Sequence, residues 1–192
     1  MNKLCRSLIL AAPLLAAFCG TVQGADTVEV YVDNLTSIRL PAPQDPVQRQ
    51  YLGLSTGDAF TLPEVKAQAV IVEIFSMYCP VCQASAPEVN KLYESVEKDP
   101  STKGRVKLIG IGANNTSVEV SVFRNKYGIE FPLLPDSDFL VQKAFAKPIR
   151  TPTLMVLKLN GSDKATLVHT HVGKFTDREE LLKVLAGLLS AR

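Results

Sequence analysis

Two cysteines, Cys79 and Cys82, stand two residues apart in the stretch IVEIFSMYCPVCQASAPEVNKL, which runs from Ile71 to Leu92. Thiols at this spacing can close a disulfide, share a metal ion or exchange disulfides with another molecule. A Cys-x-x-Cys bridge encloses almost no chain, and a disulfide constrains the unfolded chain more when it closes a longer loop. The pair would therefore be a poor structural staple, which leaves a redox pair or half of a metal site.

Other chemistry of this pair requires residues that the sequence mostly lacks. A four-ligand zinc site needs two further ligands, and the only histidines, His169 and His171, alternate on a predicted strand. We interpret them as solvent-facing strand residues, although a Cys2His2 site remains formally open. Haem attachment requires a histidine directly after the second cysteine, where this chain has Gln83. In the peroxidatic pattern Pro-x-x-x-Thr/Ser-x-x-Cys, Ser76 would fit, but Val72 occupies the proline position.

The cysteines lie where a predicted strand gives way to a predicted helix. Residues 69–75 (AVIVEIF) are nearly continuously apolar, as in a central strand buried on both faces. Residues 80–98 predict a helix with Pro80 in its first turn and Pro87 inside it. Its expected apolar stripe comprises Val81, Ala84, Val89, Leu92 and Val96.

A thiolate at such a junction is stabilised by the free N–H groups and the dipole of the helix, which lower the pKa of the thiol. The thiolate is the nucleophile of disulfide exchange. We therefore expect Cys79, at the start of the helix, to attack, and Cys82, one turn further on and more buried, to resolve the mixed disulfide.

The remaining pattern predicts the layers around this junction. Thr176 and Glu179 have the spacing of a capping box at the start of the last helix. Alternating strands and helices followed by a hairpin predict an α/β fold with a central mixed sheet and helices on both faces. Strands are expected at 106–111, 153–159 and 165–172, helices at 117–127, 139–146 and 176–190, an extended piece at 131–134 and a loop at 41–46.

The first residues are typical of a targeting segment. Lys3 and Arg6 precede an apolar stretch from Leu8 to Phe18, so residues 1–24 are expected to be a cleavable signal peptide. An uncleaved membrane anchor is the alternative, and lipidation at Cys19 is a further one. The expected location is the periplasm or the extracellular space, where disulfides can form.

The rest of the chain is expected to be an N-terminal extension at 25–53, with a short strand at Thr27–Val32, and one domain at 54–192. Cleavage after residue 24 would remove Lys3 and Arg6, and the formal net charge would fall from +2 to zero. A neutral chain gives no reason to expect nucleic acid or anionic lipid as a partner.

Four features together resemble a known family. They are the buried strand that leads into Tyr78-Cys79-Pro80-Val81-Cys82, the helical Pro87, the Thr151-Pro152-Thr153 segment, and the terminal hairpin and helix. From Leu54 to Ser190 the chain resembles the thioredoxin-like superfamily, specifically its exported TlpA/ResA/CcmG-type thiol–disulfide oxidoreductases. The resemblance implies the thioredoxin-like fold, a redox-active Cys79–Cys82 disulfide and no other cofactor.

The resemblance also implies roles for residues around the cysteines. Pro152 is expected to be a cis-proline beside the disulfide, with the backbone of Thr151 turned toward an extended substrate. Tyr78, Pro80 and Val81 are expected to contact the substrate as well. Tyr78 stands where the family commonly has Trp, which should alter partner contacts more than chemistry.

Glu73 is the candidate proton acceptor. An isolated carboxylate in a buried strand should have a raised pKa, and Glu73 resembles in position the family's buried acid, which takes the proton of the second cysteine. A solvated strand edge is the alternative setting for Glu73. The acid that many relatives carry three residues after the second cysteine is Ser85 here, and Glu88, the next carboxylate, is expected to face solvent.

The implied function is an exported reductase of protein disulfides, with cytochrome c maturation as a candidate process. Its expected partners are protein disulfide or thiol clients and a membrane electron donor, and the chain is expected to be a monomer. A disulfide oxidase or isomerase is the alternative within the same chemistry. A non-catalytic copper-binding or scaffold module is the alternative from another class. Copper(I) suits thiolates, but only Met77 lies near the motif, since Met155 is on a predicted buried strand.

Overall fold

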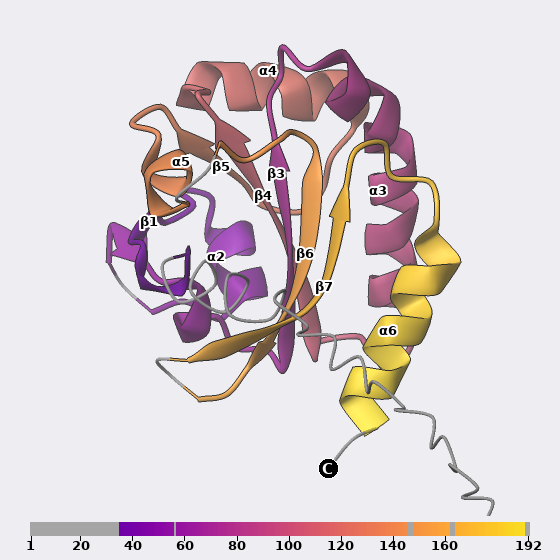
Figure 1. The fold of residues 1–192 in the computed structure, drawn as a ribbon. Helices are drawn as coiled ribbons and strands as arrows, with labels where there is room; N and C mark the ends of the chain where they lie inside the picture. Colours follow the sequence, from indigo (N-terminus) through magenta and orange to yellow (C-terminus); the bar gives the residue numbers. More distant parts are fainter. Residues whose placement is uncertain (1–34, 56, 146–147, 162–163, 191–192) are drawn as a thin grey trace, which may run out of the picture.

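The computed structural model describes residues 35–55, 57–145, 148–161 and 164–190 (Figure 1). The expected signal peptide, the residues of the extension before 35 and the strand predicted at Thr27–Val32 lie outside these ranges. No helix within the described ranges is long and apolar enough to cross a membrane.

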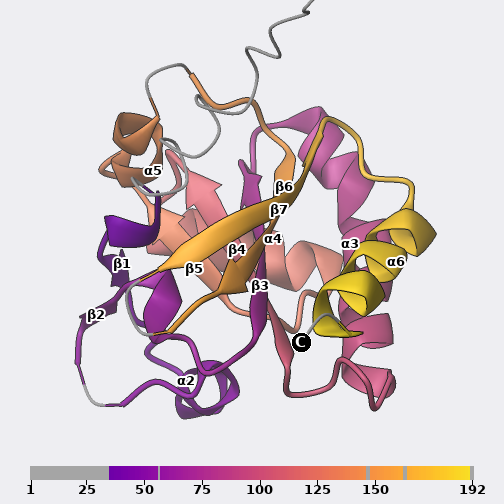
Figure 2. The same cartoon turned by 60° about the horizontal axis from the view of Figure 1, so that its bottom comes forward.

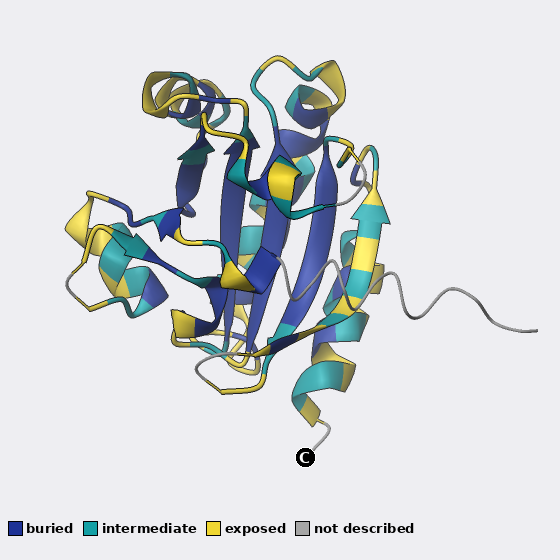
Figure 3. Cartoon of the chain, turned by 60° about the vertical axis from the view of Figure 1, so that its left-hand side comes forward, coloured by how far each residue is buried: buried dark blue, intermediate teal, exposed yellow. Residues whose placement is uncertain are grey.

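A five-stranded mixed sheet forms the centre of the molecule, as the sequence predicts. Its order is β5-β4-β3-β6-β7, with β3 paired parallel to β4, β4 parallel to β5, and the β6–β7 hairpin antiparallel. The strands are β3 (Ala69–Phe75), β4 (Val106–Ala113), β5 (Leu133–Asp136), β6 (Thr153–Leu159) and β7 (Ala165–Val172). All seven residues of β3 are buried, which confirms its central position (Figure 3).

Helices cover both faces of this sheet (Figures 1 and 2). One face packs against α3 (Pro80–Lys98), α4 (Ser117–Tyr127) and α6 (Arg178–Ser190). The other face packs against residues that precede β3 and against α5 (Leu140–Ala144). The preceding residues form β1 (Leu40–Pro41), α2 (Pro46–Leu52), β2 (Ala59–Phe60), which pairs antiparallel with β1, and the 3-10 helix η1 (Leu62–Glu64).

The alternation of β3 divides the core into two clusters. Ile71 and Phe75 join the cluster under α3, α4 and α6, whereas Val70, Val72 and Ile74 join the cluster on the other face. Because successive strand side chains point to opposite faces, Glu73 lies on the same face as Ile71 and Phe75.

The buried face of α3 differs from the predicted stripe. Val81 and Ala84 are exposed, and the buried positions are Cys82, Ser85, Ala86, Val89, Leu92 and Val96. These positions keep the helical period. The prediction was wrong in the first turns because the thiol of Cys82 and the hydroxyl of Ser85 occupy positions that an apolar pattern does not count.

Several element boundaries also differ from those predicted. The helix α2 forms after the predicted 41–46 loop, β5 starts two residues later than predicted, and α5 is shorter than 139–146. The last helix starts at Arg178, where the side chain of Asp177 accepts a hydrogen bond of 2.9 Å from the N–H of Glu180. Asp177 therefore caps this helix in place of the predicted Thr176.

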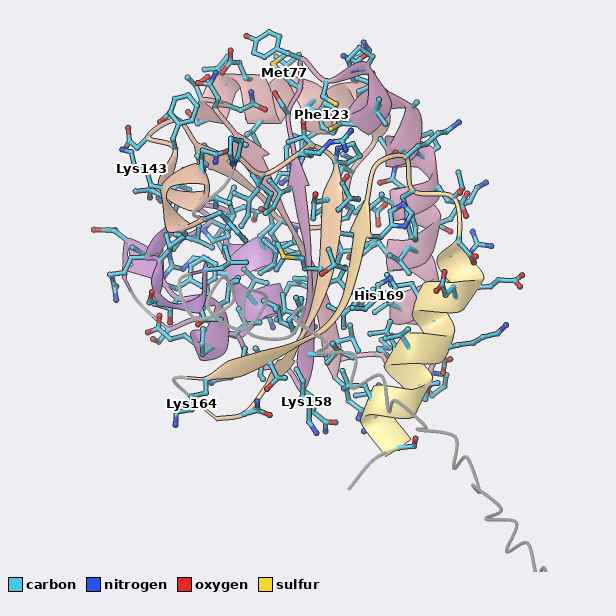
Figure 4. The ribbon with its side chains drawn as sticks, in the orientation of Figure 1. Met77, Phe123, Lys143, Lys158, Lys164 and His169 are labelled. Atoms are coloured by element: carbon cyan, nitrogen blue, oxygen red, sulfur yellow. The ribbon has the colours of Figure 1, made fainter. Side chains whose placement is uncertain are left out.

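The histidines of β7 were predicted to face solvent, but they do so only in part. His169 and His171 are half-buried, and Figure 4 shows His169 on the side of β7 that faces α6. The ring of His171 packs edge-to-face on Phe175, with centroids 5.6 Å apart. Val168 and Val172 are exposed instead. Their side chains alternate with those of the histidines along β7, which is an edge strand of the sheet.

Candidate active site

Cys79 is the N-cap residue of α3, directly after the loop that leaves β3. Its backbone is extended (φ −83°, ψ 113°), and its sulfur accepts a hydrogen bond of 3.4 Å from the N–H of Cys82. Pro80 occupies the first helical turn, where a missing N–H leaves no hydrogen bond unmade. The structure thus places the first cysteine at the end of a helix that carries partial positive charge.

The segment before β6 approaches the same sulfur from the other side. The Cys79 thiol donates a hydrogen bond of 3.4 Å to the carbonyl oxygen of Thr151. The Thr151–Pro152 peptide is cis, as predicted. Pro152 is buried and Thr151 is half-buried, so the backbone of Thr151 lines the surface beside the nucleophile.

The two thiols have pKa values on opposite sides of the ordinary one. Burial raises the pKa of Cys79, but hydrogen bonds with the Cys82 thiol, the Thr151 side chain and the backbone of Val81 and Cys82 outweigh it, so the pKa of Cys79 is lowered. Cys82 is fully buried, and burial together with its hydrogen bond to Cys79 raises its pKa to about 12. Neither cysteine forms a disulfide in this structure. Cys79 ionises first and Cys82 holds the remaining proton.

Glu73 is buried between the neighbouring strands of the sheet, with 2% of its surface exposed. Its backbone pairs with Gly110 of β4 and Leu154 of β6. Its side chain lies on the face of the sheet that packs against the core cluster containing Cys82. No described residue forms an ion pair or a side-chain hydrogen bond with its carboxyl group. Burial raises the pKa of Glu73 to about 8. The alternative of a solvated strand edge is therefore wrong.

Asn115, in the loop between β4 and α4, holds the loop before Cys79. Its Oδ1 accepts a hydrogen bond of 2.8 Å from the N–H of Met77, and its Nδ2 lies 3.5 Å from the hydroxyl of Ser76. Asn115 is fully buried. Sequence reasoning missed it because Asn114-Asn115 before a helix looks like an ordinary turn, and the contact with Met77 spans 38 residues.

Tyr78 is joined to the first turn of α4. It is 63% exposed, and its hydroxyl donates a hydrogen bond to the carboxylate of Glu119. Glu119 also accepts from the N–H of Thr116 at 2.7 Å, and the Thr116 hydroxyl accepts from the N–H of Glu119. The Thr-x-x-Glu spacing of this capping box is visible in the sequence, but its link to Tyr78 is not.

Ser85 and Glu88 on α3 have structural partners. The hydroxyl of Ser85 donates to the carbonyl of Val81 at 2.9 Å and accepts from the N–H of Phe175 at 3.0 Å. Glu88 is half-buried and forms ion pairs with Arg178 at 3.0 Å and Lys91 at 3.3 Å, so it does not simply face solvent as expected.

The described part of the chain contains no group of three or more His, Cys, Asp or Glu side chains that could hold a metal ion. The ring of His171 instead contacts the carbonyl oxygen of Lys174 at 3.0 Å. The structure brings together Cys79, Cys82, Tyr78, Thr151 and Pro152, with Glu73 on the face of the sheet beneath α3.

Comparison with known proteins gives similarities in sequence and in structure. The family described as AhpC/TSA matches residues 41–162. The thiol-disulfide oxidoreductase ResA of Halalkalibacterium halodurans is 26% identical over 132 residues, which cover 67% of this chain and 69% of the relative. ResA of Bacillus anthracis is 30% identical over 80 residues, 42% of this chain and 43% of that relative.

Two solved structures have the same fold. StoA from Bacillus subtilis aligns with a TM-score of 0.52 and 23% identity, covering 67% of this chain and 90% of that one. DsbF of Mycobacterium tuberculosis aligns with a TM-score of 0.57 and 18% identity, covering 81% of this chain and 97% of that one. At these identities the likeness establishes the thioredoxin-like arrangement of the sheet and helices.

Proposed function

Because this chain belongs to the AhpC/TSA family and has a thioredoxin-like fold, we propose that it is a thiol–disulfide oxidoreductase that works through Cys79 and Cys82. One observation carries the proposal: a partly exposed thiol with a lowered pKa caps a helix, and a buried thiol with a raised pKa lies one turn on. The lowered pKa makes the first thiol suited to attack a disulfide. Burial and a raised pKa keep the second thiol unreactive until the mixed disulfide has formed.

The reduction of a client disulfide proceeds in two exchanges. The Cys79 thiolate attacks one client sulfur, which forms a mixed disulfide and releases the other client sulfur as a thiolate. Cys82 then loses its proton and attacks the Cys79 sulfur, which releases the second client sulfur. The client gains two electrons, and its two thiolates take up one proton that derives from Cys82 and one from water, because Cys79 reacts as the thiolate. The protein is left with a Cys79–Cys82 disulfide.

Glu73 is the proposed acceptor of the Cys82 proton. Its carboxyl lies on the same sheet face as the cluster that contains Cys82, and the pKa of about 8 is far below the value of about 12 for Cys82. Proton transfer from the thiol to an ionised Glu73 is therefore uphill in the reduced protein. In the mixed disulfide Cys79 carries no charge, so the part of the rise in the pKa of Cys82 that comes from Cys79 is lost. The attack on the Cys79 sulfur also consumes the Cys82 thiolate as it forms, which draws the transfer forward. The resolving step should accelerate as pH rises through 8, and Glu73→Gln should lose that dependence. Exchange rates that stay unchanged from about pH 6 to 9 would contradict this role.

The direction of electron flow is proposed to be that of a reductase, as in the TlpA/ResA/CcmG-type proteins that the sequence resembles. The Cys79–Cys82 couple, equilibrated with glutathione or dithiothreitol, gives the potential that tests it. A value near or below roughly −230 mV indicates a reductase, and one near roughly −120 mV indicates an oxidase.

Since Thr151 before Pro152 also occurs in isomerase relatives, refolding of a scrambled disulfide protein tests the isomerase alternative.

The setting of this activity is proposed from the sequence. Residues 1–24 are interpreted as an export signal, or as an anchor if they are not cleaved, which places the domain in the periplasm or outside the cell. Its clients are proposed to be protein disulfides, with cytochrome c maturation as a candidate process, and a membrane protein is proposed to supply electrons. The redox-active disulfide is proposed to work without another cofactor, and the chain as a monomer.

Cys79→Ser separates this function from a metal-binding or scaffold role. An oxidoreductase loses disulfide turnover completely in this variant. A copper-binding module would show no turnover even as the unaltered protein, and Cys79→Ser would then lower its copper(I) stoichiometry, because thiolates are the ligands. That second result would overturn the proposal.

A further inference from the structure

The exposed apolar side chains of this protein are unevenly distributed. Eight large apolar residues are exposed in the described ranges, and two of them, Val47 on α2 and Val168 within β7, lie away from Cys79. The other six lie in the motif itself, after the C-terminal ends of β4 and β5, or at the last residue of β7: Tyr78, Val81, Val118, Val122, Phe139 and Val172. Single exposed apolar residues are ordinary, but their concentration at one end marks an interaction surface.

Two of these residues lie on one helix beside the motif. Val118 is 70% exposed and Val122 is 49% exposed, and they are four residues apart on α4. Residues at this spacing occupy the same helix face. The opposite face of α4 already buries Val120 and Phe123 in the core. Val118 and Val122 therefore do not contribute to the packing of α4 on the sheet. Figure 1 shows α4 across the upper end of the sheet, beside the β3–α3 loop.

The hydrogen bond between Tyr78 and Glu119 connects this helix face to the nucleophile. Tyr78 immediately precedes Cys79, and Glu119 immediately follows Val118 in the first turn of α4. Glu119 is itself fixed by hydrogen bonds with the backbone and the hydroxyl of Thr116 at 2.7 and 2.9 Å. The aromatic ring and the two valines are thereby held as parts of one surface.

We propose that Tyr78, Val118 and Val122, here called the α4 docking surface, bind an apolar side chain next to the reacting cysteine of a polypeptide client. This inference rests on the proposed function, because the client sulfur has to reach Cys79. Successive Cα atoms of a client are about 3.8 Å apart, so residues within a few positions of its cysteine can reach α4 while the sulfur contacts Cys79.

The opposite side of the nucleophile supports a polypeptide rather than a small disulfide as the occupant. The backbone of Thr151 lies against the Cys79 sulfur, with the Cys79 thiol 3.4 Å from its carbonyl oxygen. A client backbone can therefore run beside Thr151, cross over Cys79 and place a side chain on the α4 docking surface. A disulfide as short as oxidised glutathione has no apolar side chain to place there.

Single-turnover reduction by the wild-type and variant proteins tests this inference. The probes are two short peptides with one cysteine in a mixed disulfide with glutathione, one with Leu and one with Ser neighbours, and oxidised glutathione itself. The test variant is Val118→Ser with Val122→Ser. The matched control is Val47→Ser with Val168→Ser, which removes two exposed valines far from Cys79. All four positions are exposed, so both variants should fold.

The expected result is selective. The Val118/Val122 variant should bind the Leu-flanked peptide about 5- to 20-fold more weakly at an unchanged limiting rate, as expected when a client side chain loses apolar contact. The Ser-flanked peptide, oxidised glutathione and the control variant should change by less than about twofold. An equal loss for all three probes, or no loss for the Leu-flanked peptide, would overturn the inference. If the wild-type protein reduces none of the probes, it is the proposed function that fails.

Discussion

The N–H of Cys82 donates a hydrogen bond of 3.4 Å to the sulfur of Cys79, so the buried cysteine stabilises the charge on the partly exposed one. The Cys82 thiol adds to this effect, because its own hydrogen bond to Cys79 also lowers the pKa of that residue. The two cysteines thus divide their roles through their mutual contact: Cys79 becomes easier to ionise and Cys82 harder.

Replacing Cys82 should consequently change the titration of Cys79. Cys82→Ala removes the side-chain donor, and we expect the pKa of Cys79 to rise toward its ordinary value. Cys82→Ser retains a donor and should keep most of the lowered pKa. The rate of alkylation by iodoacetamide as a function of pH gives the pKa directly, because only the thiolate reacts. Identical profiles for the two variants would show that the Cys82 side chain has no such effect.

The stability of the reduced protein should depend on pH through Glu73. In the folded protein its pKa is about 8, above the ordinary glutamate pKa of 4.5, so the folded state binds its proton more tightly than the unfolded chain. The unfolding free energy is therefore unaffected by this group below pH 4.5, falls as pH rises between the two values, and stays low above 8. Glu73→Gln removes this dependence, and at pH 9 it should be more stable than the wild type by on the order of a few kcal/mol.

Urea denaturation at several pH values measures this difference. Both proteins have to be fully reduced, so that the Cys79–Cys82 disulfide does not contribute. Parallel curves for the wild type and Glu73→Gln from about pH 5 to 9 would indicate that the carboxyl is ionised at an ordinary pKa in the folded state.

Ser85 should contribute to stability through the segment between β7 and α6. Ser85→Ala leaves the buried N–H of Phe175 without an acceptor and should cost about 1–3 kcal/mol of unfolding free energy. Ser95→Ala is the matched control, since Ser95 also donates to the carbonyl four residues before it, at 2.8 Å, but at a half-buried position on the same helix where this hydrogen bond is exposed. We expect the control to cost under about 0.5 kcal/mol, measured by denaturant titration. Equal costs would mean that the contact with Phe175 is not what matters.

Asn115 should stabilise the loop that carries the motif. Asn115→Ala leaves the N–H of Met77 without its acceptor, and the expected loss of unfolding free energy is about 1–3 kcal/mol. Hydrogen exchange in the native protein locates the effect, because the Met77 amide should lose protection more than amides of β6. Uniform loss of protection in both places would point to general destabilisation in place of a local one.

The sequence predicts the central part of the fold well because its signals there are local and repeated. The strands β3, β6 and β7 and the helices α3 and α4 have the predicted bounds, since continuous apolar runs and helix-ending residues such as Gly128 mark them. The α2 helix was missed, although Asp45 and Gly53 stand at its ends as cap residues. It is one short helix whose stability comes from packing on the sheet rather than from its own pattern.

Contacts between distant segments account for what the sequence does not predict at the site. The position of each residue in its motif was enough to predict that Cys82 is more buried than Cys79 and that the peptide bond before Pro152 is cis. The partners of Asn115 and Glu119 lie far away in the sequence, at Met77 and Tyr78, and no periodicity encodes such a pair. The half-burial of His169 likewise depends on the packing of α6 beside the edge strand.

The complete burial of Cys82 has a consequence for the order of events in turnover. Of the two sulfurs of the couple, a second protein can touch only that of Cys79, because Cys82 is fully buried. A client and the proposed electron donor would therefore compete for one sulfur, and a ternary complex of the three would not be productive. Steady-state turnover with a protein donor should accordingly be ping-pong, with each partner at high concentration inhibiting the half-reaction of the other.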